Sequence, residues 1–429
     1  MTTAAGGPGA PPTVDPAAID PTTVDPAAVD PTAVDLADPA LYGTGDPEAV
    51  WAGLRRDHPV HWNEGPDGGG FWAVTRHADV QRVLKDTAAF TSAQGMRIGH
   101  NPTATAEAAG KMLIVTDAPR HAKIRRVISS AFTPRMVARL EQNMRTIVRE
   151  ELAAVLTDEP CEFTDFAAVL PVAVICDLLG VPKSDWRFML DSTRAAFGAS
   201  GVDPIARLEA HAGMLAYYAD LVDFRREEPG EDVVSAMANG LVDGVPLTDE
   251  EIFLNCDGLI SGGNETTRHA TVGGLLAFAA HPDQWRLAAA SPDGMDTVVD
   301  EVLRFTSPAM HVLRTAARDV EVAGVTIRAG DPVTVWMPSA NRDETVFEAP
   351  EAFDVRRTPN PHVAFGSGPH FCLGGALART ELRVLFGELL TQAAGAEPAG
   401  PARRLHSNLI RGFESAPVLL HPGDSLERR

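Results

Sequence analysis

Apolar residues recur at spacings of three and four along most of the chain, which is the period of an α-helix with one buried face. The pattern is strongest between residues 110 and 310, in segments such as VISSAF and MVARLEQNMRTIVREELAAVL. It predicts a helix that begins after Asp46 and breaks before Pro59, and another from His77 to Lys85. A further helix is expected in ALARTELRVLFGELLTQA.

Short segments favour strands instead. VHW and FWAV flank the glycine-rich turn EGPDGGG and are expected to pair. Strands are also predicted between residues 320 and 337, in VEVAGVTI and PVTVW. A long polar loop is expected to end near Gly110. The fold class is therefore mainly α with a small β region.

The first 40 residues differ from the rest. Residues 14–35 read VDPAA-IDPTT-VDPAA-VDPTA-VD, a repeat that places proline and aspartate at a fixed period and forms neither a helical nor a strand face. We expect residues 1–40 to be a disordered tail. Because no change of composition interrupts residues 41–429, they are expected to form a single domain.

The formal net charge of −21 over 429 residues argues against binding to nucleic acid or to an anionic membrane surface. The N-terminus has no basic stretch followed by an apolar run, so neither a signal peptide nor a membrane anchor is expected. The chain has 4 cysteines and no CxxC pair, which is typical of a reducing compartment. We therefore expect a cytoplasmic protein.

One cysteine, Cys372, lies in the glycine-rich stretch HVAFGSGPHFCLGG. Glycines let a backbone curl tightly and direct N–H groups at a sulfur, and a helix expected to begin near Leu373 adds its positive end. One interpretation is that Cys372 is a buried free thiol with no ligand role. A thiolate without other protein ligands instead fits a cofactor that brings its own equatorial ligands, such as haem.

The run Phe365-Gly366-Ser367-Gly368-Pro369-His370-Phe371-Cys372-Leu373-Gly374 resembles the haem-ligand signature of the cytochrome P-450 family, Phe-x-x-Gly-x-x-x-Cys-x-Gly. The resemblance implies that haem b lies between a long central helix and this loop with its following helix. Cys372 would be the axial iron ligand. Phe365, Gly366 and Gly374 would contact the cofactor.

The stretch LISGGNETTRHA is predicted to be the middle of a long helix from about Thr248 to Ala280. Two adjacent glycines cost roughly 2 kcal/mol there relative to alanines, so local propensity does not explain them. The resemblance implies that Gly262 lies against the haem. It also makes Glu265 and Thr266 the family's acid–alcohol pair, in which Thr266 bonds dioxygen and water and Glu265 relays protons.

His121 and Arg125 are four residues apart, so they share a helix face that suits an anion. The family resemblance implies that this pair meets a haem propionate. Arg314 and His370 resemble further propionate partners.

Glu301 and Arg304 lie one helical turn apart in DEVLRF. In the family this Glu-x-x-Arg pair is buried with a later basic residue, and the resemblance assigns that third position to Arg357. The trio is interpreted as scaffold rather than as catalytic machinery.

The resemblance covers about residues 41–420 and implies a monooxygenase that takes O2 and receives electrons from a separate ferredoxin or flavodoxin. We expect a basic docking patch formed by Arg120, Lys123, Arg126, Arg135, Arg379 and Arg383. Two alternatives remain: a peroxide-driven peroxygenase, and an inert haem-fold protein that recruits partners.

The substrate is expected to be a small organic molecule, in natural-product tailoring and sometimes presented by a carrier protein. The apolar pocket candidates are Met96, Ile98, Leu259, Met310, Val312, Leu409 and Ile410. Candidates to orient a polar substrate are Arg97, His311 and Arg411.

Overall fold

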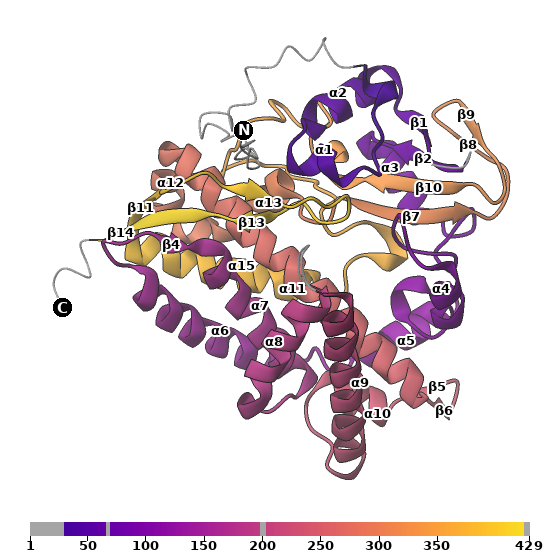
Figure 1. Ribbon diagram of the computed structural model, residues 1–429, viewed down its shortest axis with the longest axis horizontal. Helices are drawn as coiled ribbons and strands as arrows, with labels where there is room; N and C mark the ends of the chain where they lie inside the picture. Colours follow the sequence, from indigo (N-terminus) through magenta and orange to yellow (C-terminus); the bar gives the residue numbers. More distant parts are fainter. Residues whose placement is uncertain (1–29, 66–68, 198–202, 424–429) are drawn as a thin grey trace, which may run out of the picture.

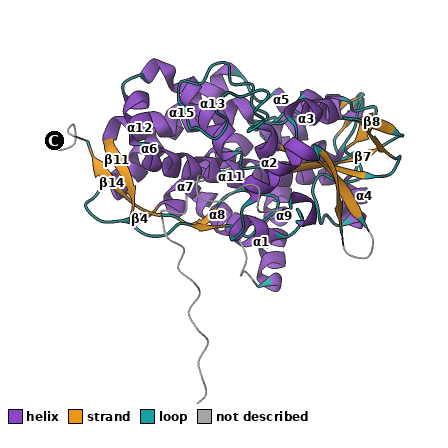
Figure 2. Ribbon diagram, turned by 90° about the horizontal axis from the view of Figure 1, so that it is seen from above, coloured by secondary structure: helices purple, strands orange, loops and turns teal. Residues whose placement is uncertain are grey.

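The computed structural model describes residues 30–65, 69–197 and 203–423. Helices occupy most of it and gather around the long helix α11 (Asp249–Ala280), while strands lie mainly at two ends of the molecule (Figures 1 and 2). The mainly α fold with a small β part is therefore confirmed. None of the described helices combines the length and the hydropathy that a membrane span requires.

The other helices form in the order expected from the apolar periodicity. Their bounds are α1 Pro39–Gly43, α2 Pro47–Asp57, α3 His77–Lys85, α4 Pro102–Ala108, α5 Arg120–Ser129, α6 Pro134–Val155, α7 Phe163–Leu179, α8 Trp186–Phe197, α9 Pro204–Glu227, α10 Val233–Ala238, α12 Pro282–Ala289, α13 Met295–Thr306, α14 Met337–Ala340 and α15 Gly375–Gln392.

The main sheet has the strand order β1-β2-β10-β7-β3. β1 and β2 pair antiparallel, as VHW and FWAV predicted, whereas β10 runs parallel to β2. Smaller sheets are β11-β14-β4, β12-β13, β5-β6 and β8-β9. The bounds are β1 Val60–Glu64, β2 Gly70–Val74, β3 Phe90–Thr91, β4 Cys161–Glu162, β5 Leu241–Val242, β6 Val245–Pro246, β7 His311–Ala316, β8 Val320–Val322, β9 Val325–Ile327, β10 Pro332–Trp336, β11 Ala393–Pro398, β12 Arg403–Arg404, β13 Phe413–Ser415 and β14 Pro417–Pro422.

Capping residues explain where the central helix begins and ends. The Thr248 hydroxyl accepts from the Glu251 N–H, and the Glu251 carboxylate accepts from the Thr248 N–H, which satisfies two free donors of the first turn. At the other end, Pro282 follows the C-cap His281 and starts α12. The predicted span of this helix is thus one residue longer than the observed one.

Three boundaries differ from the predictions. The loop before Gly110 contains α4, which Asn101 caps through the Ala104 N–H. The helix after the cysteine begins at Gly375 rather than near Leu373. Residues 30–40 already pack against the fold, because Leu36 is buried and its N–H donates to Asn63 Oδ1 at 2.8 Å. The globular part therefore starts before residue 41, and the tail repeat up to residue 29 lies outside the described residues.

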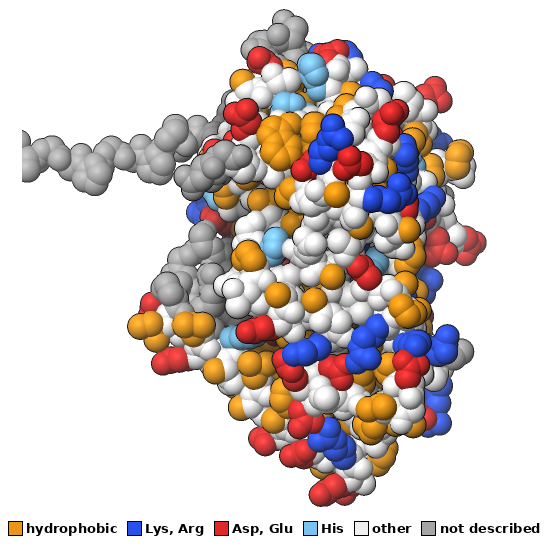
Figure 3. Space-filling view, turned by 90° about the vertical axis from the view of Figure 1, so that its right-hand side faces the viewer, with side chains coloured by type: hydrophobic (Ala, Val, Ile, Leu, Met, Phe, Trp, Pro, Cys, Tyr) orange, Lys and Arg blue, Asp and Glu red, His pale blue; other side chains and the backbone are white. Residues whose placement is uncertain are grey.

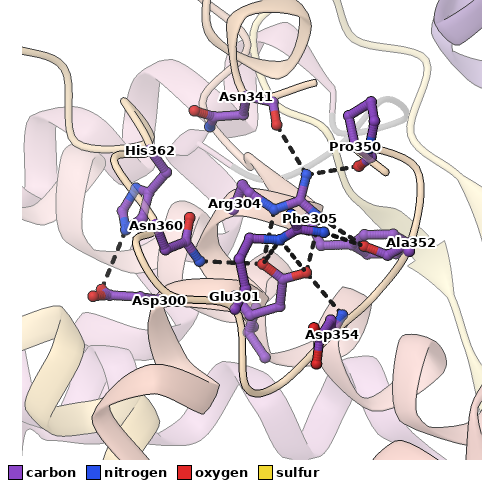
Figure 4. Close-up of polar contacts among 12 residues, drawn as sticks. Asp300, Glu301, Arg304, Phe305, Asn341, Pro350, Ala352, Asp354, Asn360 and His362 are labelled. Carbon is purple, nitrogen blue, oxygen red and sulfur yellow. Dashed lines mark hydrogen bonds and ion pairs between the residues drawn. The ribbon is translucent and has the colours of Figure 1, made fainter. Parts of the chain in front are cut away.

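A buried ion network fixes the chain that leads into the cysteine loop (Figure 4). Arg304 donates from Nε and Nη2 to both carboxylate oxygens of Glu301, at 2.7 and 2.8 Å, and both side chains are fully buried. Arg357 donates from Nε to the same carboxylate at 3.1 Å, so the structure brings the expected trio together.

The same network holds the following loop by its backbone. The Arg304 guanidinium donates to the carbonyls of Asn341, Pro350 and Ala352, and the Glu301 carboxylate accepts from the Asp354 N–H. The Asn341 side chain then accepts from the Val363 N–H at 2.7 Å. Residues 341–363 are thereby fixed just before the cysteine loop begins.

Substitution Glu301→Gln should destabilise the protein strongly, because it leaves the Arg304 and Arg357 charges uncompensated in a dry environment. The expected loss is about 3–5 kcal/mol in the free energy of unfolding, measured by denaturant titration. Asp191→Asn is the control, since the Arg187–Asp191 pair is 83% and 55% exposed, and its loss should stay below about 1 kcal/mol. Equal losses for the two variants would contradict the role given to the network.

Candidate active site

The cysteine loop is closed by its own backbone. The Cys372 N–H donates to the Phe365 carbonyl at 2.9 Å, and Gly366 and Gly368 adopt φ values of 70° and 73°, which L side chains rarely tolerate. A Cβ on Gly368 would come within 2.7 Å of the Leu84 carbonyl oxygen. The glycines therefore let the loop curl around the sulfur while it packs on α3.

The electrostatic setting of Cys372 combines burial with groups that favour an anion. Burial raises the pKa of the Cys372 thiol, while the Gly374 N–H and the charges of Arg125 and Arg379 act in the opposite direction. Cys372 is exposed, although protein atoms lie closely around its sulfur. A metal cation bonded to the sulfur would add to the stabilisation of its anion.

The middle of α11 has an open side. Gly262 is exposed although α11 is the central helix, and a Cβ built on it meets no atom within 4 Å. The Thr266 Oγ1 donates to the Gly262 carbonyl at 2.8 Å, which satisfies the hydroxyl proton and leaves the oxygen free to accept. A flat group fits against this stretch. Further along, α11 packs closely on α15, the helix that follows Cys372, with Gly274 against Phe386.

Four basic residues meet beside the loop. The rings of His121 and His370 lie 4.0 Å apart, and His121 Nε2 is buried without a partner among the described residues. The Arg314 side chain is buried, and burial lowers its pKa to about 10, with Asp117 acting in the opposite direction. Burial also lowers the pKa of Arg125, which the neighbouring Cys372 opposes.

These four residues, of which His121 and Arg314 are buried, can be tested for their fit to an anionic cofactor. Burial, together with Arg314 and His121, lowers the pKa of His370 to about 3, so the ring is neutral beside the guanidinium groups. Its Nε2 lies 3.2 Å from Ser92 Oγ. A buried guanidinium is costly unless an anion accompanies it. The carboxylates of a haem fit this cluster, and the open face of Gly262 and the sulfur of Cys372 fit the ring and its metal.

Glu265 contacts two residues, His269 and Arg268, that the sequence analysis did not predict as its partners. Its carboxylate lies 3.1 Å from His269 Nε2 and 3.4 Å from Arg268 Nη1. Burial raises the pKa of Glu265, but the hydrogen bonds and charges of His269 and Arg268 outweigh it and hold the pKa below its ordinary value. No described contact joins Glu265 to the Thr266 hydroxyl. The spacing of three and four residues within ETTRH was the available signal for these contacts.

Several residues predicted to line the substrate pocket make other contacts instead. Met310 is fully buried with Trp51 and Trp336 in an aromatic cluster, so it lines no open space. Arg411 forms an ion pair with Glu48, which holds its guanidinium away from a substrate. Arg97 is exposed. The residues that keep partly exposed apolar surface are Met96, Ile98, Leu259, Val312, Leu409 and Ile410.

His311 is also unavailable to a substrate. Its Nε2 accepts from the Ile98 N–H at 3.0 Å, and its Nδ1 therefore carries the proton and donates to the Asn408 carbonyl at 2.9 Å. The ring is buried and bonded at both nitrogens. It joins the loop around Ile98 to the C-terminal segment that carries Leu409 and Ile410.

The expected basic patch is largely neutralised. Acidic partners accompany most of its members, in the pairs Arg120–Glu251, Lys123–Asp243, Arg135–Glu231, Arg379–Asp300 and Arg383–Glu141. Acidic and basic side chains also intermingle on the face shown in Figure 3. Arg126 is exposed, and no ion pair to it is found in the described part of the chain. These residues therefore do not form the broad basic docking surface that the sequence predicted.

Comparisons with known proteins agree with this geometry. The sequence model of the family described as cytochrome P450 matches residues 295–392. The chain is 39% identical to cytochrome P450 NovI of Streptomyces niveus over 390 residues, covering 89% of this chain and 95% of that protein. It is 34% identical to linalool 8-monooxygenase of Pseudomonas putida over 400 residues, covering 90% of this chain and 98% of that protein.

Solved structures give the same result. The crystal structure of P450 OxyD, described as involved in the biosynthesis of vancomycin-type antibiotics, superposes with a TM-score of 0.83 at 37% identity. That match covers 91% of this chain and 100% of the OxyD chain.

The buried His311 predicts a specific acid sensitivity. Burial lowers its pKa to about 4 from the ordinary value of 6.5, so the unfolded chain binds a proton below about pH 6.5 while the folded protein does not. Stability is therefore lost as the pH falls from 6.5 towards 4, by on the order of 3 kcal/mol from this residue.

Denaturant midpoints measured across this window should fall less steeply for His311→Gln than for the wild type. The same substitution at the exposed His58 controls for the loss of an imidazole. An unchanged slope in His311→Gln would show that the ring titrates freely in the folded protein.

Proposed function

Because the chain belongs to the cytochrome P450 family of monooxygenases, we propose that it inserts one oxygen atom of O2 into a C–H bond or a double bond of a small organic substrate, using haem b with Cys372 as its axial ligand. The observation that carries the proposal is the setting of Cys372. Its sulfur lies among protein atoms, the Gly374 N–H and two arginines favour its anion, and the buried Arg314 guanidinium and His121 ring lie beside the loop.

The residues of this chain then have distinct tasks. When bound, the haem supplies the oxidising chemistry, and a thiolate ligand donates electron density that favours O–O cleavage. The loop from Phe365 to Gly374 holds the sulfur. His121, Arg125, Arg314 and His370 bind the carboxylates of the cofactor and set its orientation through charge-assisted hydrogen bonds.

Proton delivery falls to two neighbouring residues of α11. The Thr266 oxygen, whose own proton is donated to the Gly262 carbonyl, accepts a hydrogen bond from a water and holds it near the open face. Glu265, partly exposed, ionised and held by His269 and Arg268, takes up a proton from solvent and passes it on. Both roles rest on the family resemblance together with this geometry.

In this proposal the electrons come from a separate ferredoxin or flavodoxin, as the resemblance to the family implies. A peroxide-driven peroxygenase is the second candidate. Substrate oxidation at equal rates with peroxide alone and with a complete electron-transfer chain would favour that candidate. An inert haem-fold protein would oxidise nothing under either condition.

The substrate belongs to natural-product tailoring in this proposal, because two similar proteins support it. OxyD is described as involved in antibiotic biosynthesis, and PksS as the P450 of the bacillaene polyketide synthase. Presentation on a carrier protein is part of the proposal. Other similar proteins are a linalool monooxygenase and a steroid C26-monooxygenase.

Cys372→Ala should remove the thiolate ligand. We expect the purified variant to lose the thiolate-specific absorption band of the reduced, carbon monoxide-bound protein, whereas the control Cys161→Ala, at a partly buried position on strand β4, keeps it. A thiolate band that survives in Cys372→Ala would refute the ligand assignment.

Thr266→Ala should separate electron use from substrate oxidation. The variant keeps its haem but releases more peroxide per NADH consumed, and product formation falls by about tenfold or more because the bound water is lost. Thr266→Ser should restore coupling. Thr271→Ala removes a buried hydroxyl from another side of α11 and should have no such effect. Full coupling in Thr266→Ala would contradict the proton-delivery role.

The substrate class can be found by titrating the ferric protein with a panel and recording the spin-state change. The panel should contain linalool, a steroid, a methyl-branched fatty acid and aminoacyl groups, free and tethered to a carrier domain. A response confined to the tethered compounds is expected from the proposal. A response confined to linalool or the steroid would replace natural-product tailoring with terpene or steroid oxidation.

A further inference from the structure

The strongest unassigned feature is the buried His269, which lies one turn after Glu265 on α11. The side chain is 1% exposed and both of its ring nitrogens are engaged. Nε2 lies 3.1 Å from Glu265 Oε2, and Nδ1 lies 3.3 Å from the backbone nitrogen of Phe413. The ring therefore bridges the carboxylate proposed to deliver protons and the first residue of β13.

The hydrogen-bond roles of the ring follow from these two partners. A backbone N–H can only donate, so Nδ1 accepts from Phe413 and carries no proton. In the neutral ring the proton is then on Nε2, which donates to Glu265. Burial lowers the pKa of His269, in agreement with a neutral ring. The tautomer is thus fixed by the C-terminal segment and not by the carboxylate alone.

Gly412 makes this bridge possible. A Cβ on Gly412 would lie 2.3 Å from His269 Cγ, far inside van der Waals contact. The imidazole occupies the space that any larger residue at position 412 would need. The close approach of ring and backbone is therefore a specific feature of the segment before Phe413.

The segment that holds His269 also carries pocket residues. The Leu409 carbonyl accepts from the Met310 N–H at 2.9 Å, and the Arg411 N–H donates to the Pro308 carbonyl at 2.7 Å. Leu409 and Ile410, which keep partly exposed apolar surface, lie three and two residues before Gly412. A displacement of this loop thus moves the Phe413 N–H on which His269 depends.

Arg268 also contacts the Glu265 carboxylate, but at a longer distance than His269. Its Nη1 lies 3.4 Å from Glu265 Oε1, and its Nε donates to the Thr164 carbonyl at 3.1 Å. Arg268 is therefore anchored to α7 rather than to the pocket loop. Of His269 and Arg268, only His269 connects the Glu265 carboxylate to the segment that carries Leu409 and Ile410 in the described contacts.

We propose that His269 is a positioning residue that couples the pocket loop of residues 407–413 to the proton-delivering carboxylate of Glu265. The ring receives a hydrogen bond from the loop and gives one to the carboxylate, so the loop position sets how firmly Glu265 is held. This inference rests on the proposed function of Glu265 and extends it to a residue that touches neither substrate nor cofactor.

Two substitutions separate the halves of the bridge. His269→Asn keeps an acceptor near the Nδ1 position but loses the donor to Glu265, whereas His269→Gln can keep a donor near the Nε2 position but loses the acceptor for Phe413. Crystal structures of the holoenzyme variants should show Glu265 displaced in His269→Asn and retained in His269→Gln. A third variant, Gly412→Ala, should displace the ring without changing α11.

The wild-type protein provides a test that does not depend on any variant. In the ferrous carbon monoxide form, which is diamagnetic, 15N NMR of labelled histidines should contain a neutral Nε2–H signal that His269→Gln removes. An Nδ1–H or doubly protonated ring at this position would overturn the proposal.

The functional readout is product formed per NADH consumed, with a ferredoxin, its reductase and the panel compound that gives the largest spin-state change. His269→Asn and Gly412→Ala should lower it several-fold, and His269→Gln should approach the wild-type value. Equal losses in the Asn and Gln variants would reduce His269 to a packing residue and overturn the proposal. If the wild type forms no product at all, the proposed function fails, while the NMR and the crystal structures still decide whether His269 positions Glu265.

Discussion

The proposed chemistry depends on one sulfur anion, that of Cys372, in surroundings that are largely protein. Desolvation disfavours a thiolate, and this is the largest influence on Cys372. Backbone N–H groups, nearby guanidinium groups and a bonded metal cation are the means by which a protein offsets that cost. The glycine-rich loop supplies the first, and Arg125 and Arg379 supply the second. Because these interactions act over short distances, the loop has to be rigid.

Rigidity comes from a different set of buried charges. Glu301 is matched by two arginines, and the donors left over on Arg304 are satisfied by backbone carbonyls of the loop that precedes Val363. Near the cysteine the charges are less closely paired, since Arg314 is buried with only the electrostatic influence of Asp117 and His121 Nε2 is buried without a partner among the described residues. The matched network specifies the fold, and the unmatched one leaves a place for an anionic cofactor. A chain with a net charge of −21 thus concentrates positive charge where it is needed.

The sequence predicted the periodic and the local features well. The helix over His77–Lys85, the central helix and the strand pair β1–β2 follow from side-chain patterns of a few residues, and the cysteine loop follows from glycine spacing. Contacts between segments that are distant in the sequence could not be predicted in this way. Nothing local to His311 indicates that Ile98 and Asn408 will take both of its nitrogens, or that an acid will neutralise each of Lys123 and Arg379. Gly412 likewise acquires its meaning only when α11 brings His269 against it.

The most direct test of the account is X-ray absorption at the iron edge of the purified protein, which identifies the atoms bonded to the metal. The account predicts four nitrogen neighbours and one sulfur neighbour in the ferric protein. Iron surrounded only by nitrogen and oxygen would contradict the assignment of Cys372, and with it the proposed chemistry of the site.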